Sequence, residues 1–203
     1  MLKAKDTKKR LLGKRLMDGE ALTSIVKDMP EIIPDYKKIK QSYDAYSMDT
    51  TKPASTEGMK GLWIHGPSGT GKSHAARQLS LNQFNEEPYV MIGTKWLDGY
   101  KGEKVIIIED LDLSTAYELF HYLKLWADKY PSSAEVKGST IWLQHQMLIV
   151  TSNYSPEELY GADEEKQRTT KQRDKVSKML QPIEERFQLH QMYNRHYERE
   201  PNR

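Results

Sequence analysis

The sequence contains no cysteine. This absence excludes disulfide bonds, thiolate zinc sites and a cysteine nucleophile, and it is typical of proteins from reducing compartments. Long apolar runs are also missing: no stretch reaches the roughly 20 residues that a membrane-spanning helix needs, and the first residues lack the apolar core of a secretory signal. We therefore expect a soluble, intracellular protein with no membrane partner.

Charges of both signs are nearly balanced, with 31 lysine and arginine residues against 29 aspartate and glutamate residues. The net charge of +2 does not by itself indicate a nucleic-acid partner, because only clustered charge supports such binding. A chain of 203 residues is long enough to bury one α/β core of ordinary size and to carry a small appendage. We therefore expect one main domain and a smaller unit.

Residues 1–48 predict this smaller unit, and it is helical. The stretch PDYKKIKQSYDAYSM places three tyrosines and one isoleucine at steps of three and four, which is one face of a helix. A unit of this size buries too little apolar surface to be stable alone, so its apolar face should pack on the main domain or on neighbouring copies. Residues 49–60 predict a linker.

Residues 61–192 alternate between strand and helix patterns, and residues 193–203 predict a polar tail. Such alternation predicts an α/β fold with a central parallel five-stranded sheet and helices on both faces. A helix is expected over residues 115–130, where Thr115 and Glu118 have the spacing of a capping box. The expected strands are GLWIH (61–65), YVMIG (89–93), KVIII (104–108), MLIVTS (147–152) and RFQLHQM (186–192).

The stretch GPSGTGKS is a complete Walker A loop between a predicted strand and a predicted helix. Its glycines let backbone N–H groups point at phosphate oxygens, and the helix that follows adds its positive N-terminal end. Lys72 should reach the β and γ phosphates of ATP, and the Ser73 hydroxyl should ligate Mg²⁺. The alternative is a glycine-rich turn without a nucleotide. The loop consists of Gly66, Pro67, Ser68, Gly69, Thr70, Gly71, Lys72 and Ser73.

The stretch KVIIIEDLD predicts a buried strand that ends in Glu109 and Asp110. A strand beside the phosphate loop delivers its terminal carboxylates next to the γ phosphate, where one binds Mg²⁺ and the other polarises the attacking water. Both are candidate metal ligands, and we assign Mg²⁺ to Glu109 and water activation to Asp110. An apolar strand that ends in acids without a catalytic role is the alternative.

Two further residues are candidates for the same reaction. Asn153 comes directly after the strand MLIVTS, where its amide could contact both the γ phosphate and the water. The alternative is a turn residue, because asparagine is common in turns at strand ends. Arg186 leads into the last expected strand. If copies of the chain form a ring, it could reach the neighbour's nucleotide as an arginine finger, and the alternative is a surface ion pair.

These elements, in this order, resemble the superfamily 3 helicase domain of the AAA+ class, and in particular the replication initiators (Rep) of circular single-stranded DNA viruses of the circovirus type. The resemblance covers roughly residues 61–190 and implies a P-loop AAA+ core preceded by an oligomerisation unit. Two positions depart from the pattern, because these Reps usually carry two aspartates at 109–110 and often two arginines at 185–186. The blocks that carry the resemblance are GPSGTGKS, KWLDGYKGEKVIIIEDLD, YPSSAEVKGSTIWLQHQMLIVTSN and IEERFQL.

The resemblance also implies roles that the residues alone do not. EVKGSTI would be a β-hairpin that projects into the channel of a ring, most often a hexamer, where Lys137 beside Gly138 grips single-stranded DNA. A lysine in an exposed turn otherwise needs no such role. The implied activity is ATP-driven 3′→5′ translocation during rolling-circle replication of a small circular DNA genome in the host nucleus. Rep nickase motifs are not found in the sequence, so we do not expect the chain to cut DNA.

Two other classes of function remain open. A P-loop kinase of small molecules or nucleotides would need an acceptor pocket and an arginine-rich lid, for which residues 162–175 are the candidate segment. A DNA-binding assembly module with vestigial ATPase activity would use nucleotide only to join subunits, and the irregular Glu-Asp pair is compatible with it. Stimulation of ATP turnover by single-stranded DNA distinguishes the helicase from both.

Overall fold

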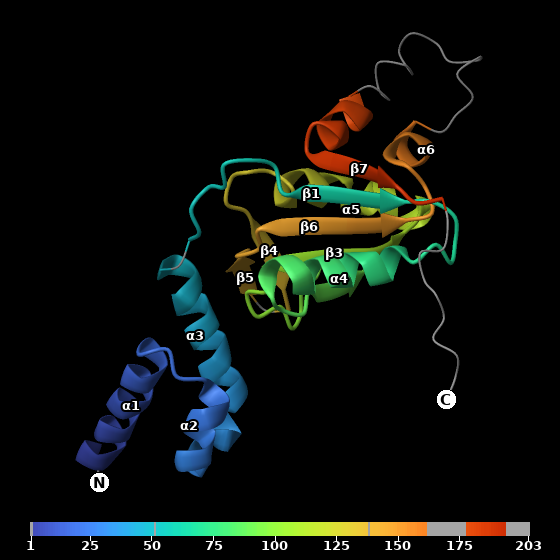
Figure 1. Ribbon diagram of the computed structural model, residues 1–203. Helices are drawn as coiled ribbons and strands as arrows, with labels where there is room; N and C mark the ends of the chain where they lie inside the picture. The colour runs from blue at the N-terminus through green and yellow to red at the C-terminus, as the bar shows by residue number, and fades with distance from the viewer. Residues whose placement is uncertain (1, 51, 138, 162–177, 194–203) are drawn as a thin grey trace, which may run out of the picture. The chain divides into compact units, whose positions relative to one another are not determined.

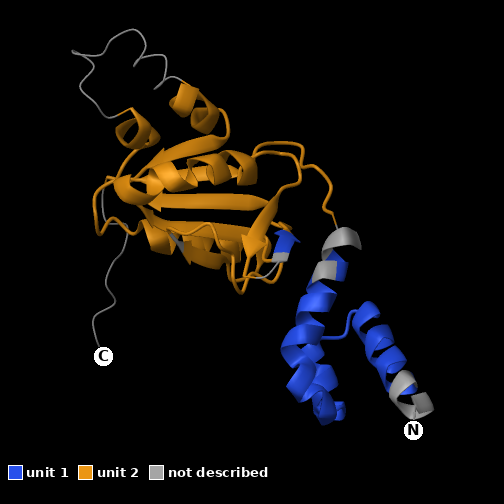
Figure 2. Ribbon diagram, turned by 180° about the vertical axis from the view of Figure 1, so that it is seen from behind, with its two compact units in different colours: residues 1–51, 138–141 blue, residues 52–137, 142–203 orange. Residues whose placement is uncertain are grey.

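The computed structural model describes residues 2–50, 52–137, 139–161 and 178–193. By their internal contacts the residues divide into two compact units, which Figure 2 colours separately. One unit contains residues 1–51 together with 138–141, and the other contains residues 52–137 and 142–203. The candidate lid segment, residues 162–175, lies outside the described residues.

The N-terminal unit is helical, as the apolar spacing predicts. It consists of α1 (Leu2–Met17), α2 (Leu22–Asp28), the short 3₁₀ helix η1 (Pro30–Asp35) and α3 (Tyr36–Thr50). Its small core is apolar, and Ile39 and Tyr43 of α3 pack against this core within the unit itself, which differs from the expected packing on the main domain or on neighbouring copies. Tyr46 on the same face is 48% exposed. The buried members of this core are Leu16, Ile25, Met29 and Ile32.

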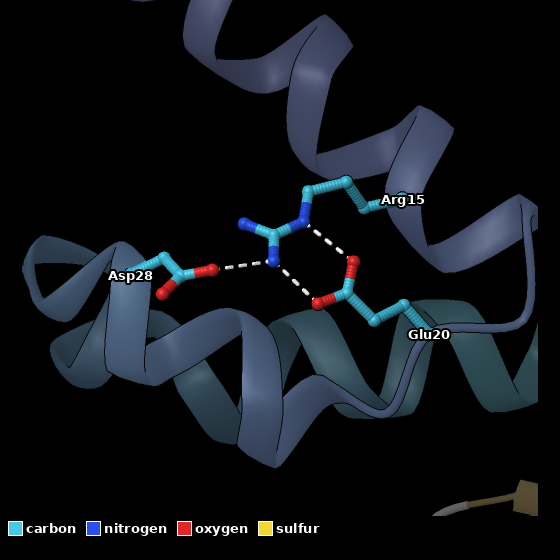
Figure 3. A network of polar contacts seen from close by, with 3 residues as sticks. All are labelled: Arg15, Glu20 and Asp28. Atoms are coloured by element: carbon cyan, nitrogen blue, oxygen red, sulfur yellow. Dashed lines mark hydrogen bonds and ion pairs between the residues drawn. The ribbon is translucent and has the colours of Figure 1, made fainter.

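A polar network fixes α1 relative to α2 within this unit (Figure 3). The Arg15 guanidinium donates from Nε to Glu20 Oε2 at 2.6 Å and from Nη2 to Asp28 Oδ2 at 2.6 Å, and Nη2 also contacts the second oxygen of Glu20. A planar guanidinium matches a carboxylate with two parallel bonds, which fixes direction as well as distance. The network therefore sets the angle of the turn between the two helices.

The second unit is built on a five-stranded parallel sheet (Figure 1). The strand order is β2-β3-β6-β1-β7, and every neighbouring pair is parallel. All carboxyl ends therefore meet at one edge of the sheet and all amino ends at the other. The strands are β1 (Gly61–His65), β2 (Tyr89–Ile92), β3 (Val105–Leu111), β6 (Met147–Ser152) and β7 (Phe187–Gln191). The α/β fold class expected from the sequence is confirmed.

Helices cover both faces of this sheet, with α4 (Lys72–Phe84) on one face and α5 (Leu113–Trp126) on the other (Figure 1). The central strands are apolar throughout because both of their faces are buried, and Val105 to Ile108 of β3 are all fully buried. A short helix, α6 (Pro156–Tyr160), follows β6 and packs near α5. Its Tyr160 hydroxyl donates to the Ala116 carbonyl at 2.9 Å.

The start of α5 differs from the expected one. The helix begins two residues before Thr115, and its N-cap is Asp112, whose carboxylate accepts from the Thr115 backbone N–H at 2.9 Å. Thr115 is the third residue of the capping box and not its first, and Glu118 has no part in it. The aspartate is the better cap here because it accepts from the backbone and from two nearby hydroxyls at once.

A separate two-stranded sheet pairs β4 (Ser133–Val136) with β5 (Ser139–Trp142). These strands match the hairpin that the resemblance predicts for EVKGSTI, although Gly138 lies outside the described residues. None of the helices in the described part of the chain combines the length and the apolar character that a bilayer crossing requires.

Candidate nucleotide-binding site

The loop between β1 and α4 has the backbone of a phosphate-binding turn. Gly66 lies at φ +140°, and a Cβ added there would approach the Met192 carbonyl oxygen to 2.1 Å, so only glycine fits. Gly71 lies at φ +91° and forms the N-cap of α4 without any side-chain cap. The first N–H groups of α4 are therefore not capped by a side chain, and the helix presents its positive end at the loop.

Lys72 joins this loop to the end of β6. Its Nζ donates to the Gly66 carbonyl at 2.8 Å, to the Pro67 carbonyl at 2.9 Å and to Asn153 Oδ1 at 2.9 Å. Burial lowers the pKa of Lys72, and the Asp110 charge acts in the opposite direction. The ammonium group is thus held at the mouth of the loop by three acceptors, two of which belong to the loop itself.

Glu109 meets the same loop from β3. Its carboxylate accepts from both Nη atoms of Arg77, at 2.8 and 2.9 Å, and a hydrogen bond from the Ser73 side chain also reaches it. The Arg77 hydrogen bonds lower the pKa of Glu109, burial raises it, and the Ser73 hydrogen bond lowers it further. The expected metal ligands of the loop and of the acidic strand are therefore linked by Arg77, whose Nη1 donates to both residues.

Asp110 differs from its neighbour in both conformation and exposure. It has a positive φ of +51°, which is uncommon for a residue other than glycine, and the β3–β6 register shifts between Ile108 and Leu111 at this point. Its backbone N–H donates to Thr151 Oγ1 at 3.1 Å, which helps to hold the bend. The side chain is exposed, whereas that of Glu109 is only 18% exposed. The two carboxylates of the pair thus face different surroundings.

The oxygen donors present here fit a nucleotide-bound Mg²⁺. The Ser73 hydroxyl and the Glu109 carboxylate are hard oxygen ligands, and Arg77 Nη1 links their residues by donating to Glu109 Oε1 at 2.8 Å and to the Ser73 carbonyl at 3.1 Å. In the part of the chain that the structure describes, no three His, Asp or Glu side chains gather into a group able to hold a metal ion. Mg²⁺ characteristically takes one or two protein ligands, several waters and the phosphates of its substrate, so a sparse donor set of this kind suits it.

The other sequence-predicted residues lie away from this cluster. Arg186 directly precedes β7, so it lies at the amino edge of the sheet, opposite the phosphate loop. Its Nε donates to Asp128 Oδ2 at 3.0 Å and its Nη1 to the Pro182 carbonyl at 3.1 Å. Lys137 is 82% exposed, with Nζ 3.6 Å from Asp98 Oδ2 and its backbone N–H 2.8 Å from Asp98 Oδ1.

The segment KWLDGY lies beside the strand that leads to Lys137. The Leu97 backbone N–H donates to the Glu135 carbonyl at 3.0 Å, and Lys95 Nζ lies 2.8 Å from Glu135 Oε2. Together with the contact between Asp98 and Lys137, these bonds hold residues 95–100 beside residues 135–137, although the two segments are far apart in the sequence. The resemblance depends on both blocks, and the structure brings them together.

Two residues of the site were not predicted. Arg77 lies four residues after Ser73 on α4, so both face the same side of the helix, and this spacing is the signal that would have found it. Thr151, which precedes Asn153 by two residues and is fully buried, supports Asp110 through its hydroxyl. A threonine in a buried strand is so ordinary that the sequence offers no signal for this role.

Comparison with known proteins agrees with this geometry. Residues 62–154 match the family model described as RNA helicase. The replication-associated protein of beak and feather disease virus is 28% identical over 153 residues, which are 73% of this chain and 47% of that protein. The replication-associated protein of canary circovirus is 35% identical over 100 residues, which are 49% of this chain and 32% of that protein. The expected resemblance to circovirus Rep is confirmed.

The chain spans less than half the length of these two relatives. The matched family segment runs from β1 to just beyond β6, so it includes the phosphate loop, the acidic strand and Asn153. Among solved structures, DnaI superposes with a TM-score of 0.37 and 16% identity, covering 76% of this chain and 80% of that one.

Proposed function

We propose that the chain is an ATP-dependent DNA helicase that assembles as a ring, most simply a hexamer, and moves 3′→5′ on single-stranded DNA. Its role would be rolling-circle replication of a small circular DNA genome, in the nucleus of the host. The observation that carries the proposal is the contact of Lys72 Nζ with Asn153 Oδ1 at 2.9 Å, because it joins a complete phosphate loop to the end of a second parallel strand. The relatives that match are replication-associated proteins of viruses.

Each residue of the cluster has a proposed part in hydrolysis. The loop N–H groups and Lys72 would hold the phosphates of ATP, with Nζ exchanging loop carbonyls for phosphate oxygens. The exposed Asp110 would orient and deprotonate the attacking water, and Asn153 would contact that water and the γ phosphate. Catalysis in such sites is positioning plus electrostatic stabilisation, which a rigid constellation on strand ends supplies.

Mg²⁺ would be held by the Ser73 hydroxyl and the Glu109 carboxylate, whose residues are linked through Arg77. When bound, it would neutralise negative charge that develops on the phosphates. This assigns the metal to Glu109, the less exposed of the two carboxylates, and the attacking water to the exposed Asp110. The two acids of the irregular Glu-Asp pair would then have different roles in the reaction.

Arg186 would complete the site of a neighbouring subunit, and Lys137 would contact DNA. Both proposals rest on the resemblance. Lys137 is highly exposed and lies in the turn between β4 and β5, which suits a cation that must reach a phosphate backbone. Arg186 is 23% exposed and paired with Asp128, so service to a neighbour would require that pair to open or to be shared.

One observation favours a second function, an assembly module with little ATPase activity. Both oxygens of Glu109 are engaged by Arg77, so a metal must share a carboxylate that already has two charged donors. A site in which nucleotide only joined subunits could tolerate such an arrangement. This reading predicts nucleotide-dependent assembly without stimulation of turnover by DNA.

The test is ATP turnover by the full chain with and without oligo-dT, followed by strand separation on a substrate with a 3′ single-stranded tail. We expect DNA to stimulate turnover, and Lys137→Ala to keep basal turnover but lose unwinding. The exposed Lys101 is a matched control, and its alanine variant should unwind normally. Unwinding that persists in Lys137→Ala would refute the hairpin assignment. Turnover that ignores DNA would favour the assembly module, and particle imaging with a non-hydrolysable ATP analogue would count the subunits.

A further inference from the structure

Arg77 makes a contact that the proposed reaction does not use. Its side chain extends from α4 to β3, where Nη1 donates to Glu109 Oε1 at 2.8 Å and Nη2 to Oε2 at 2.9 Å. Nη1 also donates to the Ser73 backbone carbonyl at 3.1 Å, one turn earlier on the same helix. A guanidinium held at three points can place a carboxylate in one position and one orientation.

The position it fixes is the one beside Ser73. A glutamate has one more rotatable bond than an aspartate, so an unrestrained Glu109 could swing its carboxylate away from the loop. Arg77 Nη1 donates both to Glu109 Oε1 and to the Ser73 carbonyl, so the guanidinium links these two residues, and both oxygens of Glu109 point to the Arg77 fork. Each carboxylate oxygen has two lone pairs, so one Arg77 bond to each leaves room for the Ser73 hydroxyl and for a cation.

We propose that Arg77 is a positioning residue that holds the Glu109 carboxylate at Ser73, and thereby sets how tightly the site binds Mg²⁺ together with nucleotide. The inference rests on the proposed function, because it assumes that Ser73 and Glu109 share the metal. It deepens that function by adding an outer contact that neither touches the phosphates nor takes part in the chemical step. Outer contacts of this kind typically change metal affinity by about 10- to 100-fold when they are removed.

An opposite role for Arg77 is physically conceivable and gives the opposite result. If the guanidinium competed with the cation for Glu109, its removal would tighten Mg²⁺ binding. If the pair served only to tie α4 to β3, its removal would lower thermal stability and leave the metal unaffected. The half-buried pair, with Arg77 37% and Glu109 18% exposed, is wet enough that its structural contribution alone should be modest.

The test measures binding and needs no catalysis. A fluorescent ADP analogue is titrated into the full chain in excess EDTA and then at increasing Mg²⁺, and the Mg²⁺ concentration that gives half of the affinity gain is recorded. Relative to wild type, Arg77→Ala should raise that concentration by about tenfold or more. Nucleotide affinity in EDTA should stay within about twofold, because Arg77 reaches the loop at the Ser73 carbonyl and contacts neither Lys72 nor the two loop carbonyls that Lys72 holds.

Two variants and one control make the result specific. Arg77→Lys keeps the charge but not the fork, so we expect an intermediate shift, and it also provides a reading if the alanine variant folds poorly. Arg77→Ala combined with Glu109→Asp should lose less than the sum of the two single changes, since the shorter acid needs less restraint. Gln78 is the exposed neighbour on α4, and Gln78→Ala should match wild type.

Three outcomes would overturn the inference. Equal Mg²⁺ requirements in wild type and Arg77→Ala would reduce the pair to a structural tie, and a lower requirement in the variant would make Arg77 a competitor. Both results would leave the proposed function intact. If instead the wild-type protein bound nucleotide with no response to Mg²⁺, the metal site itself would be wrong, and the proposed function would fall together with the inference.

Discussion

The two edges of the parallel sheet both carry charged and polar side chains, but they use them in different ways. At the carboxyl edge, Lys72, Glu109 and Asn153 contact one another or the phosphate loop, and Asp110 beside them is exposed. At the amino edge, the polar side chains are directed into the fold. His145 is 2% exposed, and its Nε2 donates to the Trp126 carbonyl at 2.7 Å.

The amino edge also holds a charged group with few exposed atoms. Lys60 is 7% exposed, and burial lowers its pKa while the charge of Asp128 opposes that change. Arg186 meets the same Asp128 through Nε and Nη2, both at 3.0 Å. The Arg186 guanidinium and His145 Nε2 thus have partners within the chain, although the buried His145 Nδ1 has no hydrogen-bond partner among the described residues, whereas polar groups at the carboxyl edge are arranged around backbone N–H groups that a ligand can use. The comparison shows that the location of a polar group's partners, inside the fold or around an open backbone loop, indicates a structural or a ligand-binding role better than its charge does.

The largest expected effect is the loss of ATP turnover when the carboxyl edge of the sheet is altered. Lys72→Ala should reduce ATP turnover to background, because it removes the cation of the phosphate loop and the partner of Asn153. Thermal stability should also fall, because Lys72 is only 6% exposed and makes three hydrogen bonds that alanine cannot make, so turnover is expressed per folded molecule. Turnover measured by phosphate release checks this, with Lys101→Ala as the control. Unchanged hydrolysis in Lys72→Ala would refute the assignment of the site.

The second effect asks whether Arg186 belongs to the amino edge alone. If it acts on a neighbour's nucleotide, Arg186→Ala should lower turnover by about a thousandfold, and mixing it with Lys72→Ala should partly restore activity. Asp128→Asn breaks the same ion pair but keeps the arginine, so it should cost less than about tenfold in turnover.

Equal effects of these two substitutions would identify the pair as purely structural. In that case both variants should lose thermal stability to a similar extent, turnover per folded molecule should be preserved, and mixing should restore nothing. The Asp128→Asn variant is therefore the control that makes the Arg186 result interpretable, because it removes the contact without removing the candidate finger.

The smallest effect concerns stability and pH at the amino edge. The pKa of His145 is lowered to about 3, mainly by burial and to a smaller extent by the Lys60 charge, while the hydrogen bond to Trp126 opposes both effects. In the unfolded chain His145 binds a proton as the pH falls below about 6.5, whereas in the folded chain it stays neutral until about pH 3. Its contribution to the free energy of unfolding is therefore fully present above about pH 6.5 and is lost as the pH falls toward 3. Between pH 7 and pH 5 the loss from this residue should be about 2 kcal/mol.

Urea unfolding at pH 7 and pH 5 measures this loss. His145→Gln should show a smaller difference between the two conditions than wild type, whereas His121→Gln, at an exposed position on α5, should show the same difference as wild type. The range lies above that in which carboxylates titrate, and His65, whose pKa is also lowered by burial, contributes equally in all three proteins. An unchanged pH difference in His145→Gln would mean that the imidazole is not buried in its neutral form.

Much of this arrangement could be predicted because it is local in sequence. The five strands of the central sheet are continuous apolar runs or lie beside motifs. Two of them, β1 and β6, are found at their expected bounds, and the other three differ by at most three residues at either end. The contact between Lys72 and Asn153 follows from two strand ends that parallel topology brings to one edge. The start of α5 was misplaced because Asp112, Ser114 and Thr115 are all acceptable caps, and only the geometry of the turn chooses among them.

The contacts that could not be predicted join residues that are far apart in the sequence. Arg77 and Glu109 are 32 residues apart, and Arg186 and Asp128 are 58 apart, so neither pairing has a local signature. An arginine next to acidic residues suggests a sequence neighbour as its partner, but Arg186 lies 3.7 Å from Glu185 and 3.0 Å from Asp128, so the shorter contact is with the distant residue. The site assignments themselves remain predictions until the variants are measured.

The close approach of Met192 to Gly66 gives the phosphate loop a mechanical neighbour. The Met192 N–H donates to the His65 carbonyl at 2.8 Å, directly before the loop, so the exit of the last strand and the entrance of the nucleotide cradle are fastened at one point. A load applied to the polypeptide just after that point would be transmitted to the cradle within a few bonds. A tag or fusion partner joined after Met192 should therefore be attached through a flexible linker. A short, rigid linker would transmit force to the phosphate loop and could be used to distort it.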